Sequence, residues 1–126
     1  MVGIPSTANK GYAPITGKSM LAHIKDFSQP VYEPNDGVGL EAASSSAYFL
    51  NGYKIVKNNI PLGDNQWYMY NIEKDTTEST DLAAEEPELF QKMLAAYEAY
   101  ERRVGVVKMP NGYSASGEAS KNQLSK

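Results

Sequence analysis

The sequence predicts an α+β fold: a small antiparallel β-sheet of three to four strands with one C-terminal helix packed on it. Three observations predict this fold. Segments rich in aromatic and β-branched residues alternate with turn residues between positions 38 and 72. An apolar stripe at helical spacing begins near position 87. The two ends lack either period, so we expect an irregular N-terminal segment and a mobile C-terminal tail.

The N-terminal third contains one short helical pattern. Residues 1–18 are rich in Pro, Gly, Ser and Thr and are expected to form a linker. Met20, Leu21 and Ile24 then follow at the spacing of an amphipathic helix. Residues 26–37 contain prolines and an Asn-Asp-Gly run, which predict a connecting loop.

The predicted sheet occupies the middle of the chain. A strand is expected near Val38 to Ala43, a turn at Ser44-Ser45-Ser46, and a hairpin partner from Ala47 to Asn58. Asn51-Gly52 is typical of a tight turn that divides this partner into two strands. The last strand spans Gln66 to Ile72. Alternation places Trp67, Met69 and Asn71 on one of its faces and Tyr68, Tyr70 and Ile72 on the other.

The helix is predicted from its start, its stripe and its end. Pro87 suits the first helical position, and Gly105 is a natural stop. Glu98 and Arg102 are four residues apart and are expected to pair on the exposed face. The apolar stripe consists of Leu89, Met93, Ala96, Tyr97, Tyr100 and Val104.

Length, charge and composition exclude several classes of function. A chain of 126 residues forms one domain at most, which buries roughly two thirds of its unfolded surface. The formal net charge is −3 and no Lys/Arg-rich tract is present, so we expect no nucleic-acid partner. No apolar run is long enough to span a bilayer, so we expect no membrane partner. The absence of cysteine excludes disulfides and thiolate chemistry, and leaves the redox compartment open.

No set of residues predicts a catalytic, cofactor-binding or metal site. Carboxylates near a helix start suit a divalent cation, but more often they are solvated partners of the helix dipole, which we favour here. His23 is the only histidine and is expected at the surface or in a linker. Gly37-Val38-Gly39 is too short for a phosphate-binding loop and predicts a turn into a strand. The acidic residues concerned are Asp81, Glu85, Glu86 and Glu88.

The nine tyrosines allow two interpretations. They suit stacking on a carbohydrate or an aromatic ligand, but Tyr97 and Tyr100 lie on the helical stripe and Tyr68 and Tyr70 on a strand. We therefore expect them in the core or at an interface.

Several motifs, in order, resemble those of one family. The run Trp67 to Ile72, a polar loop and Asp81-Leu82-Ala83 before a helix resemble the signature that closes many sulfatases. The chain is thus similar to the C-terminal subdomain of the sulfatase family, within the alkaline-phosphatase-like superfamily, and most similar to its bacterial arylsulfatase branch. The resemblance covers most of residues 11–110. Its other motifs are Pro14 to Leu21, Val38-Gly39-Leu40-Glu41, Lys54 thirteen positions after Glu41, and Gly105-Val106-Val107 with Pro110.

The resemblance implies a layout and a partner. It divides the chain into a linker (residues 1–18), the subdomain (19–107) and a flexible tail (108–126). In the family, the small sheet and its helix dock against a catalytic α/β domain, which is intramolecular in relatives. That domain hydrolyses sulfate esters with formylglycine and a calcium-type cation. The residues for that chemistry are not found in this sequence, so no cofactor is expected in this chain.

The sequence also departs from the family pattern. Ser28-Gln29-Pro30-Val31-Tyr32 matches Ser-x-Pro-x-Arg of the formylglycine motif except at Tyr32, and we attribute the match to chance. Ser44-Ser45-Ser46-Ala47 stands where relatives often have Gly-Asn/Arg-Arg-Ala, and the basic position near Phe49 is apolar. Thr76 replaces the usual Pro. For these reasons no substrate-binding role is carried over.

The expected function is that of a structural C-terminal subdomain, inactive alone, which supports a catalytic domain. It predicts a contiguous apolar patch on one face of the sheet or on the helical stripe. The alternative is a stand-alone binding or interaction module derived from the same fold, which predicts no such patch. A small hydrolase would need a nucleophile and base that we do not find. Localisation stays open: the start, Met1 to Pro5, lacks a signal peptide, so either the chain is cytoplasmic or its natural start is missing, and the resemblance favours the second.

Overall fold

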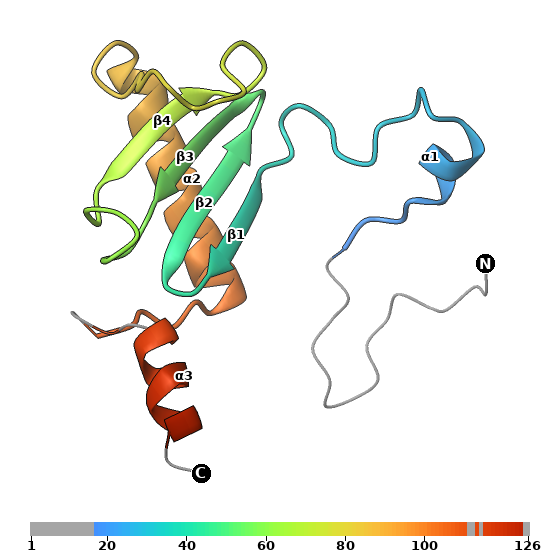
Figure 1. Ribbon diagram of the computed structural model, residues 1–126. Helices are drawn as coiled ribbons and strands as arrows, with labels where there is room; N and C mark the ends of the chain where they lie inside the picture. The colour runs from blue at the N-terminus through green and yellow to red at the C-terminus, as the bar shows by residue number, and fades with distance from the viewer. Residues whose placement is uncertain (1–16, 111–112, 114, 125–126) are drawn as a thin grey trace. The chain divides into compact units, whose positions relative to one another are not determined.

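The computed structural model describes residues 17–110, 113 and 115–124, and it divides the chain into two compact units, Met1–Glu33 and Pro34–Lys126. The second unit confirms the predicted α+β class (Figure 1). The helices are α1 (Leu21–Lys25), α2 (Pro87–Val104) and α3 (Ala115–Leu124), and the strands are β1 (Val38–Ala42), β2 (Ser45–Leu50), β3 (Tyr53–Lys57) and β4 (Trp67–Asn71).

Helix α1 belongs to the first unit. It confirms the short helix predicted from Met20, Leu21 and Ile24, although none of its residues is buried. Residues 1–16, which make up most of the predicted linker and part of the motif from Pro14 to Leu21, lie outside the described residues.

The four strands form an antiparallel meander in the order β1-β2-β3-β4. The turn at Asn51-Gly52 is confirmed, with φ angles of 50° and 75°. Positive φ at both central residues is the mark of a two-residue type I′ hairpin, whose twist suits the flanking strands.

The predicted turn at Ser44-Ser45-Ser46 is confirmed at Ser44 and wrong at Ser45 and Ser46. The first hairpin instead turns at Ala43 and Ser44, with φ of 49° and 70°, and β2 already begins at Ser45. Hydrogen bonds favour the longer strand: the Ser46 hydroxyl donates to Glu41 Oε2 at 2.9 Å, and Ser45 Oγ accepts from the Asn59 N–H at 3.2 Å. The serine run therefore serves strand pairing more than the turn.

Helix α2 covers one face of the sheet and forms the core with it. Ile55, Met69 and Met93 are fully buried, and Tyr97 is 4% exposed. The helix starts at Pro87 and ends before Gly105, whose N–H donates to Glu101 O at 2.9 Å, as predicted. The Glu98–Arg102 pair is present at 3.8 Å. The predicted stripe is buried or half-buried except at its end, because Val104 is 46% exposed.

Gly39 in β1 is in close contact with α2. A Cβ at Gly39 would overlap the ring of Tyr100, so glycine lets that ring lie directly against β1. Val38 begins β1, as the turn-into-strand interpretation of Gly37-Val38-Gly39 predicts.

The C-terminal segment contains a helix that the sequence did not predict. Helix α3 lies within the predicted flexible tail, and its Lys121 pairs with Glu118 at 2.7 Å. Residues 111–112, 114 and 125–126 of that tail lie outside the described residues. Among the helices that the structure describes, none has both the length and the hydropathy to cross a membrane.

Candidate functional site

The face of the sheet away from α2 is an apolar surface, called the open face below. Strand register defines it, since alternate residues point to opposite sides and Ile55 and Met69 point to α2. Two rows cross all four strands, and Leu40 in the first row is 54% exposed. The first row is Leu40, Ala47, Val56 and Tyr68, and the second is Val38, Phe49, Lys54 and Tyr70.

Lys54 is the one charged residue in these two rows, and it is neutralised locally. Its Nζ donates to both carboxylate oxygens of Glu78, at 2.7 and 2.8 Å, and lies 5.7 Å from the ring centroid of Phe49. Lys54, which is one of the positions that resemble the family, therefore forms an ion pair that joins the open face to the β4–α2 loop.

The loop that carries Glu78 is organised around one aspartate. Asp75 accepts hydrogen bonds from the N–H groups of Ser79 (2.8 Å) and Thr80 (2.9 Å) and from the Thr77 hydroxyl (3.0 Å). The Thr80 N–H, followed by its other donors, holds the pKa of Asp75 below its ordinary value. This loop therefore keeps its shape without the proline that Thr76 replaces.

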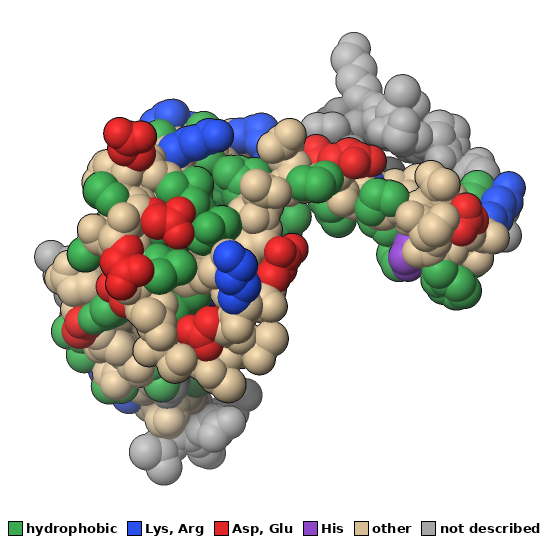
Figure 2. Space-filling model, turned by 90° about the horizontal axis from the view of Figure 1, so that it is seen from above, with side chains coloured by type: hydrophobic (Ala, Val, Ile, Leu, Met, Phe, Trp, Pro, Cys, Tyr) green, Lys and Arg blue, Asp and Glu red, His purple; other side chains and the backbone are tan. Residues whose placement is uncertain are grey.

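Two of the four acidic residues considered for a metal, Asp81 and Glu86, bind protein donors instead. Asp81 Oδ1 accepts from the N–H groups of Met69 (2.9 Å) and Ala83 (3.0 Å), and Glu86 accepts from the Tyr53 hydroxyl at 3.2 Å. The part of the chain that the structure describes contains no group of three or more His, Cys, Asp or Glu arranged to hold an ion. Figure 2 shows acidic side chains spaced among hydrophobic ones on the face that it views.

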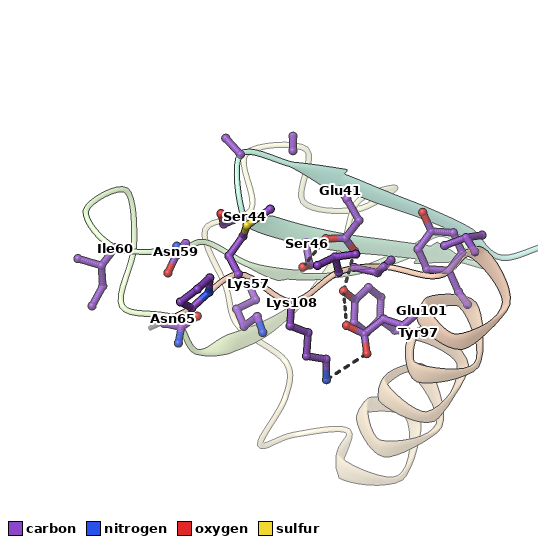
Figure 3. A pocket seen from close by; sticks show the side chains of 18 of the residues that line it. Glu41, Ser44, Ser46, Lys57, Asn59, Ile60, Asn65, Tyr97, Glu101 and Lys108 are labelled. Carbon is purple, nitrogen blue, oxygen red and sulfur yellow. Dashed lines mark hydrogen bonds and ion pairs between the residues drawn. The ribbon is translucent and has the colours of Figure 1, made fainter. Parts of the chain in front are cut away.

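A groove lies between the end of the β1–β2 hairpin and the C-terminal end of α2 (Figure 3). Its volume is about 1030 Å³. Apolar residues of the segment after α2, among them Val106, Val107 and Met109, line one part of it. The polar residues in its lining include Glu41, Ser46, Lys57, Asn59, Asn65, Glu101 and Lys108.

A hydrogen-bond network joins β1, β2 and α2 in this groove. The Tyr97 hydroxyl lies 2.6 Å from Glu41 Oε1 and 3.2 Å from Glu101 Oε1, and Ser46 donates to the other Glu41 oxygen. Lys108 Nζ lies 3.4 Å from Glu101 Oε2. Burial, followed by the hydrogen bond to Glu41, raises the pKa of Tyr97 above its ordinary value, so the phenol stays protonated and donates.

The tyrosines on α2 and β2 pack with one another in the core. The ring centroids of Trp67 and Tyr97 are 4.8 Å apart, and those of Tyr48 and Tyr100 are 6.3 Å apart. Tyr48 is 8% exposed and Tyr97 4%. The core interpretation is therefore confirmed for these two, and their rings do not offer a free face to a ligand.

The two candidates in the first unit lie on or after α1. His23 Nδ1 donates to Gln29 O at 2.7 Å, and its ring meets Phe27 edge-on at 5.4 Å. The Ser28 hydroxyl, from the near match to the formylglycine motif, donates to Asp26 Oδ1 at 2.7 Å. The first bond joins α1 to the turn that follows it, and the second lies within that turn.

Comparisons with known proteins give limited similarities. No family model matches the chain, and no curated protein matches it. Among solved structures, the crystal structure of Ps i-CgsB, a carrageenan sulfatase, is 24% identical over 51% of this chain, with a TM-score of 0.40. Its complex with k-i-k-neocarrahexaose is 20% identical over 64% of this chain, with a TM-score of 0.45. The chain spans 14% and 18% of the length of those two structures, and at these identities and TM-scores neither similarity supports an inference about this chain.

Proposed function

We propose that this chain is the C-terminal structural subdomain of an arylsulfatase-like sulfuric ester hydrolase, which supports a catalytic domain and does no catalysis alone. The open face of the sheet is the observation that carries the proposal. A four-stranded sheet with apolar residues on both faces needs a cover on both, because layered domains bury each apolar face against another layer. Here α2 covers one face, and the open face is the docking surface for the catalytic domain.

The charge distribution of the open face favours docking. Its only charged residue, Lys54, already has both its charge and two of its donors satisfied by Glu78. Burying this face would therefore remove apolar area from water without leaving an unpaired charge. An interface core depleted of charge is typical of stable associations.

The motifs of the resemblance acquire structural reasons that agree with the proposal. The Trp67 run is β4, Asp81 holds the outer edge of that strand, and Lys54 joins Glu78 of the loop before α2. These residues stabilise the subdomain, and none of them performs chemistry in it.

The proposal is tested by replacing the C-terminal subdomain of an active arylsulfatase with this whole chain. We expect the chimera to fold and to hydrolyse p-nitrophenyl sulfate in the presence of calcium. Leu40→Glu, which places a charge on the open face, should reduce soluble, active chimera at least tenfold. Gln91→Glu adds the same charge at an exposed position on α2 and should leave activity unchanged.

The isolated chain provides the complementary measurement. Alone it should not hydrolyse p-nitrophenyl sulfate, with or without calcium. Turnover by the pure chain would contradict the proposal, and so would equal effects of Leu40→Glu and Gln91→Glu in the chimera.

A further inference from the structure

The two outer edges of the sheet differ in how their backbone groups are satisfied. At β4, the outward N–H of Met69 donates to Asp81 Oδ1 at 2.9 Å, and the outward carbonyl accepts from the Leu82 N–H at 2.8 Å. The chain thus covers its own β4 edge with the segment that leads to α2. This is how natural sheets block pairing with another strand.

The described residues of the second unit provide no such cover at the β1 edge. The two-residue turn at Ala43-Ser44 makes Ala42 and Ser45 a hydrogen-bonded pair, and bonding then alternates along the strand. Leu40 and Val38 therefore bond to β2, whereas the N–H and C=O groups of Gly39 and Glu41 point outward. Among the described residues, these outward N–H groups donate no backbone hydrogen bond and these carbonyls accept none.

The groove described above reaches this open edge at Glu41 and Ala42, and its lining continues across the sheet to Lys57 and Asn65. Glu41 lies in its lining, and Tyr97, Tyr100 and Val104 bring the C-terminal part of α2 to the same groove. A strand added to β1 would direct every second side chain toward the α2 side of the sheet, and the side chain opposite Glu41 would enter the groove. An open strand beside a helix-walled groove is the arrangement in which proteins bind extended peptides.

The proton count in the network indicates which side chain fits there. The Tyr97 hydroxyl has one proton, and the shorter contact, 2.6 Å, assigns it to Glu41. Glu101 Oε1, 3.2 Å from the same hydroxyl, then lacks that donor. Among the described residues, its other oxygen has one long contact, 3.4 Å, with Lys108, whose side chain is 80% exposed. A cation on an added strand opposite Glu41 would face two carboxylates and supply the missing donors.

We propose that the β1 edge and its groove bind an extended segment of another polypeptide by strand addition, with a lysine or arginine between apolar residues placed opposite Glu41. Backbone bonds to Gly39 and Glu41 provide affinity, and the Glu41–Glu101 pair selects the cation. This inference is independent of the proposed function, because it concerns the edge of β1 and not the open face.

The test is an NMR titration of the full ¹⁵N-labelled chain with blocked eight-residue peptides of alternating valine and threonine. One peptide carries a central lysine, a second a central glutamate, and a third the lysine with alternate backbone N-methyl groups. We expect the lysine peptide to shift the amide signals of Gly39 and Glu41 and to bind roughly tenfold more tightly than the glutamate peptide. The N-methylated peptide should not bind, since its bonding edge is blocked.

Variants assign the selectivity to the two carboxylates. Glu41→Gln and, separately, Glu101→Gln should reduce the preference for lysine while binding through the backbone persists. Using both keeps the test decisive if one variant fails to fold. Val56→Thr, on the open face, should leave the titration unchanged.

Three results would overturn the proposal. One is equal binding of the N-methylated peptide, and another is signal shifts confined to the open face. The third is a concentration-dependent shift of the β1 signals without peptide, which would mean that a second copy of the chain occupies the edge.

Discussion

The two faces of one strand, β3, show how differently the two sides of this sheet are used. Ile55 points to α2 and is fully buried, whereas its neighbour Val56 points to the open face and is half-buried. Both are β-branched and apolar, so composition does not distinguish them. The difference is the cover that the second unit itself provides: α2 packs on one side of the sheet, and no other described helix of that unit packs on the opposite side (Figure 1). Within the described part of the second unit, one face is buried against α2, and the other presents half-buried and exposed apolar side chains.

The largest expected effect follows from this difference. Ile55→Ala should lower the free energy of unfolding by about 2–5 kcal/mol, because it leaves a cavity beneath α2. Val56→Ala should cost at most about 1 kcal/mol, because water reaches its site. Urea unfolding followed by circular dichroism measures both. Equal losses would mean that the open face is packed as tightly as the covered one.

The next effect concerns the polar border of the covered face. Tyr97→Phe removes a donor to Glu41 and should cost about 1.5–3 kcal/mol near neutral pH. Thermal and urea unfolding of the variant measure the loss, and Tyr32→Phe, at an exposed tyrosine of the first unit, is the control.

The same tyrosine should make stability depend on alkaline pH. Its pKa in the fold is raised above the ordinary value of 10.0, so the folded state holds the proton more tightly than the unfolded state. The contribution is fully present below pH 10 and is lost as the pH rises toward the folded pKa. The wild-type chain should therefore lose more stability above pH 10 than Tyr97→Phe does. Parallel pH curves for both proteins would contradict this assignment.

The covered face was the part that sequence could predict. Pro87, the spacing from Leu89 to Tyr100, and the alternation from Trp67 to Ile72 are local signals, and each element they predict is present. Local signals also predicted Asn51-Gly52. They failed at Ser45 and Ser46, because strand pairing with β1 and the bond from Ser46 to Glu41 outweigh the turn preference of serine.

The candidate surfaces depend on residues far apart in the chain. Glu41 and Tyr97 are 56 positions apart, and no spacing rule relates them. In the sequence, Asp81 is one member of an acidic cluster. In the structure, its carboxylate accepts a hydrogen bond from Met69 at the outer edge of β4. An apolar patch was predicted in one of two places. The register of the four strands puts Leu40, Val56 and Tyr68 on one face of the sheet, where Leu40 is exposed and the other two are half-buried. The mobility of the tail remains a prediction.

A smaller effect is expected where β1 and β2 meet. Ala43 and Ser44 both adopt positive φ, which costs non-glycine residues free energy, and the Ser44 hydroxyl is buried without a hydrogen-bond partner among the described residues. Replacing the pair by Asn-Gly, as in the second hairpin, should stabilise the chain by about 1–2 kcal/mol. In the second hairpin, Gly52→Ala should destabilise the chain, because a Cβ at position 52 would lie 2.7 Å from the Glu73 carboxylate carbon. A loss of stability in the Asn-Gly variant would contradict this explanation, because Ala43 and Ser44 would then stabilise the first hairpin.

The smallest expected effect distinguishes the open face as an interface from the open face as a solvated surface. Lys54 and Glu78 have side chains that are 18% and 33% exposed, so removing one partner by Lys54→Met should cost only about 0.5–1 kcal/mol in the isolated chain. The double variant Lys54→Met with Glu78→Gln should recover most of that loss, since no carboxylate is left unpaired. In the chimera the single variant should cost more than in the isolated chain, because docking would bury Glu78 without its cation. The stability loss caused by Lys54→Met is measured by urea unfolding of the isolated chain and by thermal inactivation of the chimera. Equal losses in the chain and in the chimera would mean that Lys54 stays exposed to water and that the catalytic domain docks at another surface.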